Sequence, residues 1–400
     1  MVSSPPKMKI IYYSPHPTHD IVSEVGYATH QRETIIALQN LGAEVIPVIM
    51  GGTTFEEVPY RDGKAITHTG LKGFIKKIIP RYVWVTLKDF RLMMHDKRAA
   101  KRLEAAIIKY QPDLVYERSE YLQDASVAVV KKYKVKHYIE VNSPFVQEMK
   151  HLEGSSLWTS LGHYKEKRKY KSADKVWVVS SALKEFLVNR YQIESSKIII
   201  SPNRINKEEF ERVIPLPFDL KTSQKQVVIG FVGSILPHHD VEDLIEAFGI
   251  VRRKNKNALL CIVGGGSLLD SLKQKVKEQQ LTESVRFIGK VPHQQVPSYI
   301  QQMDICLLTG SCWYCSPIKL FEYGILSKAI IATNLKPIQD VMEHLKDGIL
   351  IEKGAEAIAN AMIQLIENPD LRQSIGRYFK SKIEAEYQWE HAAKMILFAF

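Results

Sequence analysis

Short apolar runs alternate with polar or glycine-bearing turns and with segments of helical apolar spacing along most of this chain. The first example has an apolar run at 10–13, a polar loop up to Gly26, a helical pattern that ends at Gly42, and a second apolar run at 45–49. Strand, loop, helix and strand in this order predict a parallel βαβ unit. The same pattern predicts further strands of one sheet at 113–116, 136–141, 175–179 and 198–200.

The pattern lapses at 213–226, where two prolines and a polar run indicate a linker between domains. A second set of alternating elements follows, with strands predicted at 227–232, 259–263, 285–288, 305–308 and 329–333. We therefore predict an α/β protein of two Rossmann-like, doubly wound domains at 1–212 and 227–385, with a last segment at 386–400. Ligands of such sheets bind outside the carboxyl ends of the strands, and two facing domains form a cleft.

The composition changes this picture little. The 400 residues are 45% hydrophobic and 25% charged, which is typical of a water-soluble globular protein of two domains. No window approaches the ~18 uncharged apolar residues that span a bilayer, and the four cysteines form no disulfide framework. We therefore expect a cytoplasmic protein.

The positive charge of the chain suggests an anionic membrane as a possible partner. The formal net charge is +11, and the segment Lys72–Arg102 carries ten Lys or Arg against two Asp, with apolar residues interleaved. Such a segment is typical of a basic amphipathic surface that docks on an anionic membrane, although a solvated face over ordinary core positions explains it equally well. A second basic cluster runs from Lys165 to Lys171. No nucleic-acid-binding module is recognisable, so we expect no nucleic-acid partner.

The strongest local signal is the stretch 316–324, which predicts a loop that opens a short helix ahead of a buried strand. Ser316, Pro317 and Ile318 form the loop and first helical position, and Lys319 and Glu322 lie three residues apart on one helix face. Proline suits the first turn, and the N–H groups there favour an anion. Lysine for phosphate and glutamate for a sugar hydroxyl suggest a nucleotide-sugar site.

Glycines and a histidine mark further strand ends. Gly26 precedes the first helix, Gly233 and Ser234 follow one strand, and Gly265 lies in a triple glycine after another. Glycine permits backbone N–H groups to approach a diphosphate, but turn geometry alone also accounts for it. His239 is a candidate donor to phosphate or an inert surface residue. The absence of GxGxxG and Walker motifs argues against nicotinamide cofactors and ATP.

Metal and redox roles receive little support. A hard-cation site favours clustered carboxylates, and no Asp-x-Asp pair follows a strand, so we expect no metal. Cys312 and Cys315 have redox or zinc spacing, but no second pair accompanies them. Trp313 and Tyr314 between them are better read as a wall for the base or sugar of the donor.

Two polar groups follow strands of the first domain. Arg118 is a candidate for stabilising charge on a leaving phosphate, and Glu140 for orienting an acceptor hydroxyl. Structural salt bridging explains either residue equally well.

Together these segments resemble the retaining glycosyltransferases of family four, the group 1 glycosyltransferases, which have the GT-B fold. The resemblance rests on the order and spacing of 116–118, 140–142, 180–181, 202–203, 233–234, 241–248, 263–266 and 316–323. It implies transfer of a sugar from a nucleotide-diphosphate-sugar to a glycan or lipid-linked acceptor, without metal or cofactor. By resemblance, Glu322 binds ribose, Lys319 and Gly26 bind the phosphates, and the segment 389–400 returns to the acceptor-binding first domain.

No enzymic nucleophile is evident, which favours a front-face mechanism in which the departing diphosphate accepts the proton of the acceptor. We expect an enzyme of polysaccharide biosynthesis, peripheral on the inner membrane face. A sugar-nucleotide epimerase of the same architecture and a catalytically weak nucleotide-binding scaffold are the alternatives.

Five positions depart from the family pattern. Tyr314 stands where many members have glutamate, Ser234 and His239 where arginine and lysine are frequent, Asp240 where glycine is usual, and Arg204 where glycine is common. Phosphate neutralisation then rests more on Lys319, His239 and Arg204.

Overall fold

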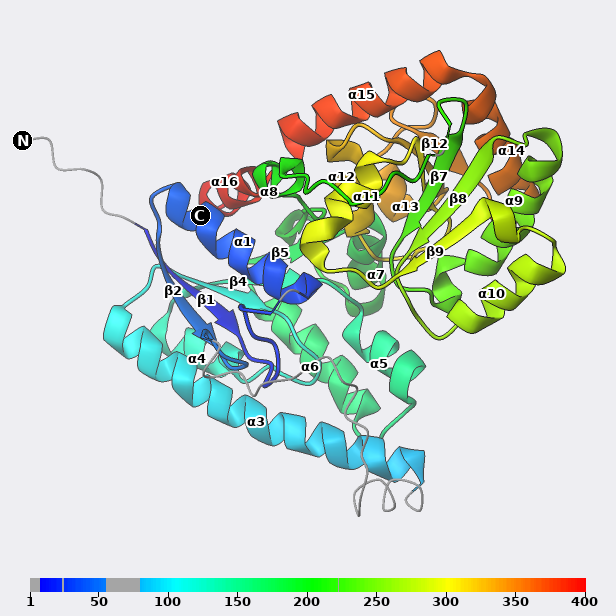
Figure 1. The fold of residues 1–400 in the computed structure, drawn as a ribbon. Helices are drawn as coiled ribbons and strands as arrows, with labels where there is room; N and C mark the ends of the chain where they lie inside the picture. Colours follow the sequence, from blue (N-terminus) through cyan, green and yellow to red (C-terminus); the bar gives the residue numbers. More distant parts are fainter. Residues whose placement is uncertain (1–7, 24, 55–79, 222) are drawn as a thin grey trace, which may run out of the picture. The chain divides into compact units, whose positions relative to one another are not determined.

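The computed structural model describes residues 8–23, 25–54, 80–221 and 223–400. The described residues form two compact units, one within 1–201 together with 392–400 and the other within 202–391 (Figure 1). Each is an α/β unit with its own parallel sheet. Residues 202–212 lie in the second unit and 392–400 in the first, whereas the sequence placed the domain limits at 212 and 385.

The sheet of the first unit has six strands in the order β2-β1-β3-β4-β5-β6, all paired in parallel. All were predicted from apolar runs: β1 (Lys9–Ser14), β2 (Glu44–Ile49), β3 (Leu114–Arg118), β4 (Lys136–Val141), β5 (Lys175–Val178) and β6 (Ile198–Ile200). The helices are α1 (Gly26–Asn40), α3 (Arg81–Tyr110), α4 (Ser126–Tyr133), α5 (Phe145–Glu153), α6 (Thr159–Ser172), α7 (Ser181–Tyr191) and, from residue 392 on, α16 (Trp389–Phe398). Figure 1 shows helices on both faces of this sheet.

The sheet of the second unit also has six parallel strands, in the order β12-β11-β10-β7-β8-β9. Its strands are β7 (Val227–Val232), β8 (Ala258–Val263), β9 (Val285–Gly289), β10 (Ile305–Leu308), β11 (Ala329–Thr333) and β12 (Ile349–Ile351), the last of which was not predicted. Its helices are α8 (Lys207–Glu211), α9 (Val241–Lys254), α10 (Leu269–Glu278), α11 (Val296–Gln301), α12 (Ile318–Ile325), α13 (Lys336–Gln339), α14 (Ala355–Glu367) and α15 (Pro369–Glu386).

Strand β7 shows why the second sheet is covered on both faces. Ile229 and Phe231 belong to the apolar core that includes α9 and α14, whereas Val228 and Val232 belong to the core that includes α12 and α15. Successive side chains of a strand point to opposite faces, so a continuous apolar run requires a helix layer on each side. This doubly wound arrangement confirms the predicted α/β class and directs the strand-end loops to one edge.

The basic segment predicted at Lys72–Arg102 begins outside the described residues, which resume at 80. From Arg81 onward it is part of α3, a helix of 30 residues. The helix buries Val85, Ala99 and Leu103 against the unit and leaves other apolar side chains exposed. In the described part of the chain, we find no helix that is both long and apolar enough to cross a membrane.

Candidate functional site

A pocket of about 320 Å³ lies at the carboxyl ends of β7, β8 and β9 in the second unit. Parallel sheets bind ligands at this edge, because the strand-to-helix loops converge there. Of the predicted site residues, Gly233, Ser234, Gly265 and Lys319 line the pocket. The remaining wall is formed by Val232, Val263, Gly264, Lys290, Val291 and Val296. Part of the predicted donor site is therefore assembled in one cavity.

The glycines of this pocket allow two loops to approach at backbone distance. Gly264 has φ +137°, and a Cβ there would lie 1.9 Å from the carbonyl oxygen of Gly233. A Cβ on Gly266 would lie 2.1 Å from the carbonyl oxygen of Ile235. The loops are joined by the N–H of Ile235, which donates to the Gly265 carbonyl at 3.1 Å. Side chains are therefore excluded at Gly264 and Gly266 by packing, which leaves an open, backbone-lined wall.

Lys319 and Glu322 lie on one face of α12 and form an ion pair, with 2.7 Å between Lys319 Nζ and Glu322 Oε2. The Glu322 side chain is 1% exposed and that of Lys319 is 23% exposed. Helix α12 is held against β7, because the Val232 N–H donates to the Tyr323 hydroxyl at 3.0 Å. Lys319 lines the pocket, whereas the buried Glu322 does not and is linked to it through Lys319.

The loop before α12 is fixed from the start of the second unit. The N–H of Asn203 donates to Ser316 Oγ at 2.9 Å, and its side-chain amide donates to the Ser316 carbonyl at 2.6 Å. Pro317 precedes the first helical residue, Ile318. None of residues 316–318 lines the pocket; their geometry orients α12 and hence Lys319.

His239 and Asp240 lie between β7 and α9, away from the lining of the pocket. His239 Nδ1 lies 3.3 Å from the Gly310 carbonyl oxygen, and the His239 carbonyl accepts from the Thr309 hydroxyl at 2.8 Å. Asp240 has a left-handed backbone with φ +49°, which explains why glycine suits this position, and its carboxylate is 3.1 Å from Lys353 Nζ.

Two other departures from the family pattern are buried. Tyr314 is 7% exposed and packs edge-on against Trp313, with 5.3 Å between ring centroids. Arg204 is 4% exposed and donates to the Pro202 carbonyl at 2.6 Å. Neither residue lines the pocket.

In the first unit, Arg118 and Glu140 lie opposite each other on β3 and β4 and contact directly. Arg118 Nη1 lies 2.8 Å from Glu140 Oε1, which also accepts from the Asn142 amide at 2.5 Å. The Tyr116 hydroxyl donates to Glu140 Oε2 at 3.0 Å, and His30 Nδ1 lies 3.4 Å from Oε1. Burial raises the pKa of Glu140, but His30, Arg118 and these hydrogen bonds lower it more, so its pKa lies below the usual range.

Sequence reasoning missed a histidine cluster beside this pair. His19 is stacked between His16 and Tyr27, with ring centroids 3.9 Å and 4.3 Å away, and its Nδ1 lies 2.8 Å from Glu120 Oε1. Burial lowers the pKa of His16 to about 4. The signal was present, because His16 and His19 follow β1 at its carboxyl end, where ligands of parallel sheets bind.

His16, His19 and Glu120 each bring one possible metal ligand within 4.8 Å of the others. However, the two imidazoles are stacked at an interplanar angle of 24°, so their nitrogen lone pairs lie in two nearly parallel planes. A shared metal ion needs them to converge at about 2 Å from each nitrogen. The arrangement therefore favours hydrogen bonding over metal binding.

The predicted site residues thus fall into separate groups. Gly26 is the exposed first residue of α1, while Arg118 and Glu140 form a buried pair in the same unit. Apart from Gly26, the predicted donor-binding residues belong to the second unit.

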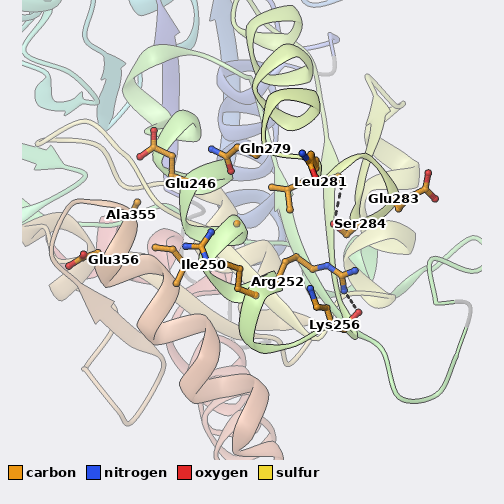
Figure 2. A pocket seen from close by; sticks show the side chains of 13 residues that line it. Glu246, Ile250, Arg252, Lys256, Gln279, Leu281, Glu283, Ser284, Ala355 and Glu356 are labelled. Atoms are coloured by element: carbon orange, nitrogen blue, oxygen red, sulfur yellow. Dashed lines mark hydrogen bonds between the residues drawn. The ribbon is translucent and has the colours of Figure 1, made fainter.

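A larger cavity of about 740 Å³ lies elsewhere in the second unit, near the amino ends of β8 and β9 (Figure 2). Its walls come from α9, from residues 279–284 and from the start of α14. The Arg252 guanidinium there donates to the Ala258 carbonyl at 3.2 Å. This edge lies opposite to the carboxyl ends at which open parallel sheets bind ligands, so size alone does not make it the site.

Comparison with known proteins agrees with this fold and with the earlier resemblance. A profile of Glycosyltransferase Family 4 matches residues 26–209, and one of Glycosyl transferases group 1 matches 215–382. The chain is 25% identical over 303 residues to "Uncharacterized glycosyltransferase MJ1069" of Methanocaldococcus jannaschii, covering 72% of this chain and 74% of that protein.

Two further proteins similar to this chain are described with the nucleotide or nucleotide sugar that they bind or use. The chain is 23% identical over 169 residues to a GDP-mannose-dependent alpha-(1-6)-phosphatidylinositol monomannoside mannosyltransferase of Mycobacterium tuberculosis, covering 40% of this chain and 44% of that protein. The structure of Anabaena Alr3699/HepE in complex with UDP superposes with a TM-score of 0.69 at 12% identity, covering 98% of each chain. Since the two profiles together span most of the sequence and the fold is GT-B, this chain belongs to the group 1 glycosyltransferase family.

Proposed function

We propose that this glycosyltransferase moves a sugar from a nucleotide-diphosphate-sugar to a glycan or lipid-linked acceptor, with retention of the anomeric configuration and without a metal ion. The observation that carries the proposal is the backbone-lined pocket at the carboxyl edge of the second sheet, with Lys319 at its wall and the buried Glu322 paired with Lys319. Glycine backbone, a lysine and a buried carboxylate match the phosphates and ribose hydroxyls of a nucleotide.

In the proposed reaction, the bond between the anomeric carbon and the diphosphate oxygen breaks as the acceptor oxygen bonds to the same face of the sugar. The acceptor proton passes to the departing diphosphate, so no protein base is consumed. Lys319 stabilises the charge that develops on the leaving group, and Glu322 fixes both Lys319 and the ribose. The work of the protein is then positioning and electrostatic stabilisation.

The acceptor is proposed to bind at the first unit. Glu140 accepts from Arg118, Tyr116 and Asn142, so its role is to hold Arg118 in place rather than to bind a hydroxyl itself. His19, fixed by Glu120 on one nitrogen, is better suited to contact an acceptor hydroxyl. This changes the sequence-based hypothesis for Glu140.

A panel of UDP-, GDP-, ADP- and CMP-sugars in a thermal-shift assay tests the donor class. Ligand that binds only the folded state raises the melting temperature, and we expect one base to stand out. Stabilisation by none of the four contradicts the proposal and favours a scaffold. For the stabilising donor, a changed free sugar nucleotide without acceptor indicates an epimerase, and an acceptor-dependent product indicates transfer.

Glu322→Gln tests the site residue directly. The amide keeps the shape but loses the charge that pairs with Lys319, and we expect donor turnover to fall at least about 100-fold. Glu352→Gln is the matched control, since Glu352 follows β12 on an exposed position of the same unit. Equal turnover in the wild type and in Glu322→Gln, with both folded, removes Glu322 from the site.

Docking on an anionic membrane is proposed through α3. Tyr82, Val83, Leu87, Phe90 and Met94 are each 42–49% exposed along its first half, among exposed lysines and arginines. Leu157, 66% exposed, is tied to this stretch through its N–H, which donates to the Thr86 hydroxyl at 3.2 Å. An apolar strip flanked by cations suits a membrane interface.

Leu87→Glu with Met94→Glu should lower sedimentation with vesicles that contain phosphatidylglycerol, because two charges enter the strip. Ile108→Glu is the control, since Ile108 is 57% exposed near the other end of the same helix. Equal vesicle binding by the wild type, the double variant and the control contradicts docking through α3.

A further inference from the structure

Lys290 is a second lysine of the candidate donor pocket that the sequence pattern did not single out. It follows Gly289, the last residue of β9, and lies in the pocket wall with Lys319. Its aliphatic stem passes over Gly265, since a Cβ on that glycine would lie 3.1 Å from both Cγ and Cε of Lys290. The stem therefore occupies the space that a side chain at Gly265 would need.

The two lysines differ in their partners. The Lys319 ammonium is paired with the carboxylate of Glu322 at 2.7 Å. The Lys290 side chain has no hydrogen bond or ion pair with any residue that the structure describes. Among these described residues, no further charged side chain lines the pocket. The uncompensated positive charge of this cavity is thus that of Lys290.

The neighbouring loop increases the need for such a charge. Residues 233–240 contain no lysine or arginine, and the histidine at 239 is directed to the Gly310 carbonyl rather than to the pocket. A diphosphate carries several negative charges, whereas the Lys319–Glu322 pair is close to neutral. An ammonium on a flexible stem can reach phosphate as a compact charge with three donors.

We propose that Lys290 binds the diphosphate of the nucleotide donor and so supplies the cation that residues 233–240 lack. The proposal rests on the proposed nucleotide-sugar function, and it assigns a phosphate-binding role to this lysine. Gly265 contributes by leaving room for the Lys290 stem across the pocket wall.

The test is isothermal titration of the full chain with UDP, GDP and ADP, and with the matching nucleosides, which lack phosphate. Lys290→Met retains an unbranched stem without the charge. We expect the affinity for the better-binding diphosphate to fall at least about tenfold, a loss of about 1.4 kcal/mol. The affinity for the matching nucleoside should change less than about twofold, because the base contacts are kept.

Three variants separate a specific from a general effect. Lys273→Met removes an exposed lysine of α10 outside the pocket, and we expect binding like the wild type. Lys290→Arg keeps the charge and should retain most of the affinity. Gly265→Ala should weaken diphosphate binding in the same direction as Lys290→Met, because its methyl group displaces the Lys290 stem.

The outcomes are distinguishable. Equal diphosphate affinity in the wild type and in Lys290→Met overturns the role of Lys290 while leaving the nucleotide-sugar function in place. An equal loss for diphosphate and nucleoside also overturns it, since Lys290 then acts on the base. If the wild type binds none of the nucleoside diphosphates UDP, GDP and ADP at millimolar concentration, the proposed function falls, and the inference with it.

Discussion

The carboxyl edges of the two sheets follow the same βαβ pattern, but paired side chains fill one edge and glycine backbone lines the other. In the first unit the edge is filled with mutually paired side chains: the buried Arg118 with Glu140, and the half-buried His19 with Glu120. In the second unit the edge is lined by glycine backbone around a pocket of about 320 Å³ in which Lys290 has no partner among the described residues. The first edge is an ordered polar network. The second edge is a cavity in which the positive charge of Lys290 has no counter-charge among the described residues.

Because of this difference, the two edges suit different roles in the proposed reaction. A network whose charges are already satisfied holds its side chains in fixed geometry, which suits the orientation of a reacting hydroxyl. A pocket with surplus positive charge and exposed backbone suits an anionic ligand that completes it. The second edge is therefore the better candidate for the nucleotide diphosphate, and the first for the acceptor.

The largest effect should come from breaking the network of the first edge. Arg118→Met leaves the buried carboxylate of Glu140 without its cation, and we expect a loss of about 3 kcal/mol in the free energy of unfolding, measured by urea denaturation. The double variant Arg118→Met with Glu140→Gln should recover part of this loss, because no buried charge remains unpaired. A single variant as stable as the wild type contradicts the network.

A single added methyl group should disrupt the packing of the loops at the second edge. Gly264→Ala places a Cβ 1.9 Å from the Gly233 carbonyl oxygen at φ +137°, so we expect about 2–3 kcal/mol of destabilisation and loss of nucleotide binding. Gly289→Ala is the matched control, because Gly289 has φ +85° and an added methyl group would meet no described residue within 4 Å beyond its chain neighbours. If both variants lose the same stability, backbone strain alone matters and the close approach of the loops does not.

Acid should weaken the first edge, through His16. The pKa of His16 is lowered to about 4, mainly by burial; Glu120 opposes this shift, and His19, His95 and Lys88 add smaller decreases. The unfolded chain binds this proton near pH 6.5 and the folded chain only near pH 4, so stability falls as the pH is lowered through that window. We expect His16 to contribute on the order of 2 kcal/mol to this loss.

Urea denaturation at about pH 6.5 and about pH 5 measures the slope across this window. His16→Phe keeps a ring beside His19 without a titratable nitrogen, and its stability should fall less over this range. Glu120 and Glu140 have pKa values lowered below 4.5, so their stabilising contributions are lost only at lower pH. Identical slopes for the wild type and His16→Phe contradict a half-buried His16 that stays neutral in the folded chain.

The smallest expected effect concerns Asp240 beside the second edge. Its left-handed backbone favours glycine, while its ion pair with Lys353 is partly solvated, since the Lys353 side chain is 63% exposed. Asp240→Gly should therefore change the melting temperature by no more than the equivalent of about 1 kcal/mol, in the stabilising direction. A clear destabilisation indicates that the ion pair outweighs the backbone preference.

The sequence predicted the two sheets well because their strands are buried on both faces and appear as apolar runs. The sequence analysis missed β12, because three residues are too few to show a pattern. It interpreted part of α3 as a surface segment, because exposed apolar residues obscure the helical periodicity. The Lys319–Glu322 pair was predicted from helical spacing, since both partners lie on one element.

The sequence alone could not predict contacts between segments that lie far apart along the chain. Lys290 stands out only because β9 lies beside β8, which brings its stem over Gly265. Likewise, Glu120 meets His19 across 101 residues of sequence, through the pairing of β1 with β3. Local patterns identify elements, whereas strand order decides which of their ends share a site.

Hydrogen–deuterium exchange with and without saturating UDP or GDP tests the central claim that the second edge holds the nucleotide. We predict that bound nucleotide slows exchange in segments 232–236, 263–266 and 290–291 and in α12, and leaves segments 246–256 and 279–284 around the 740 Å³ cavity unchanged. Slower exchange at the larger cavity, with none at the carboxyl edge, would contradict the account.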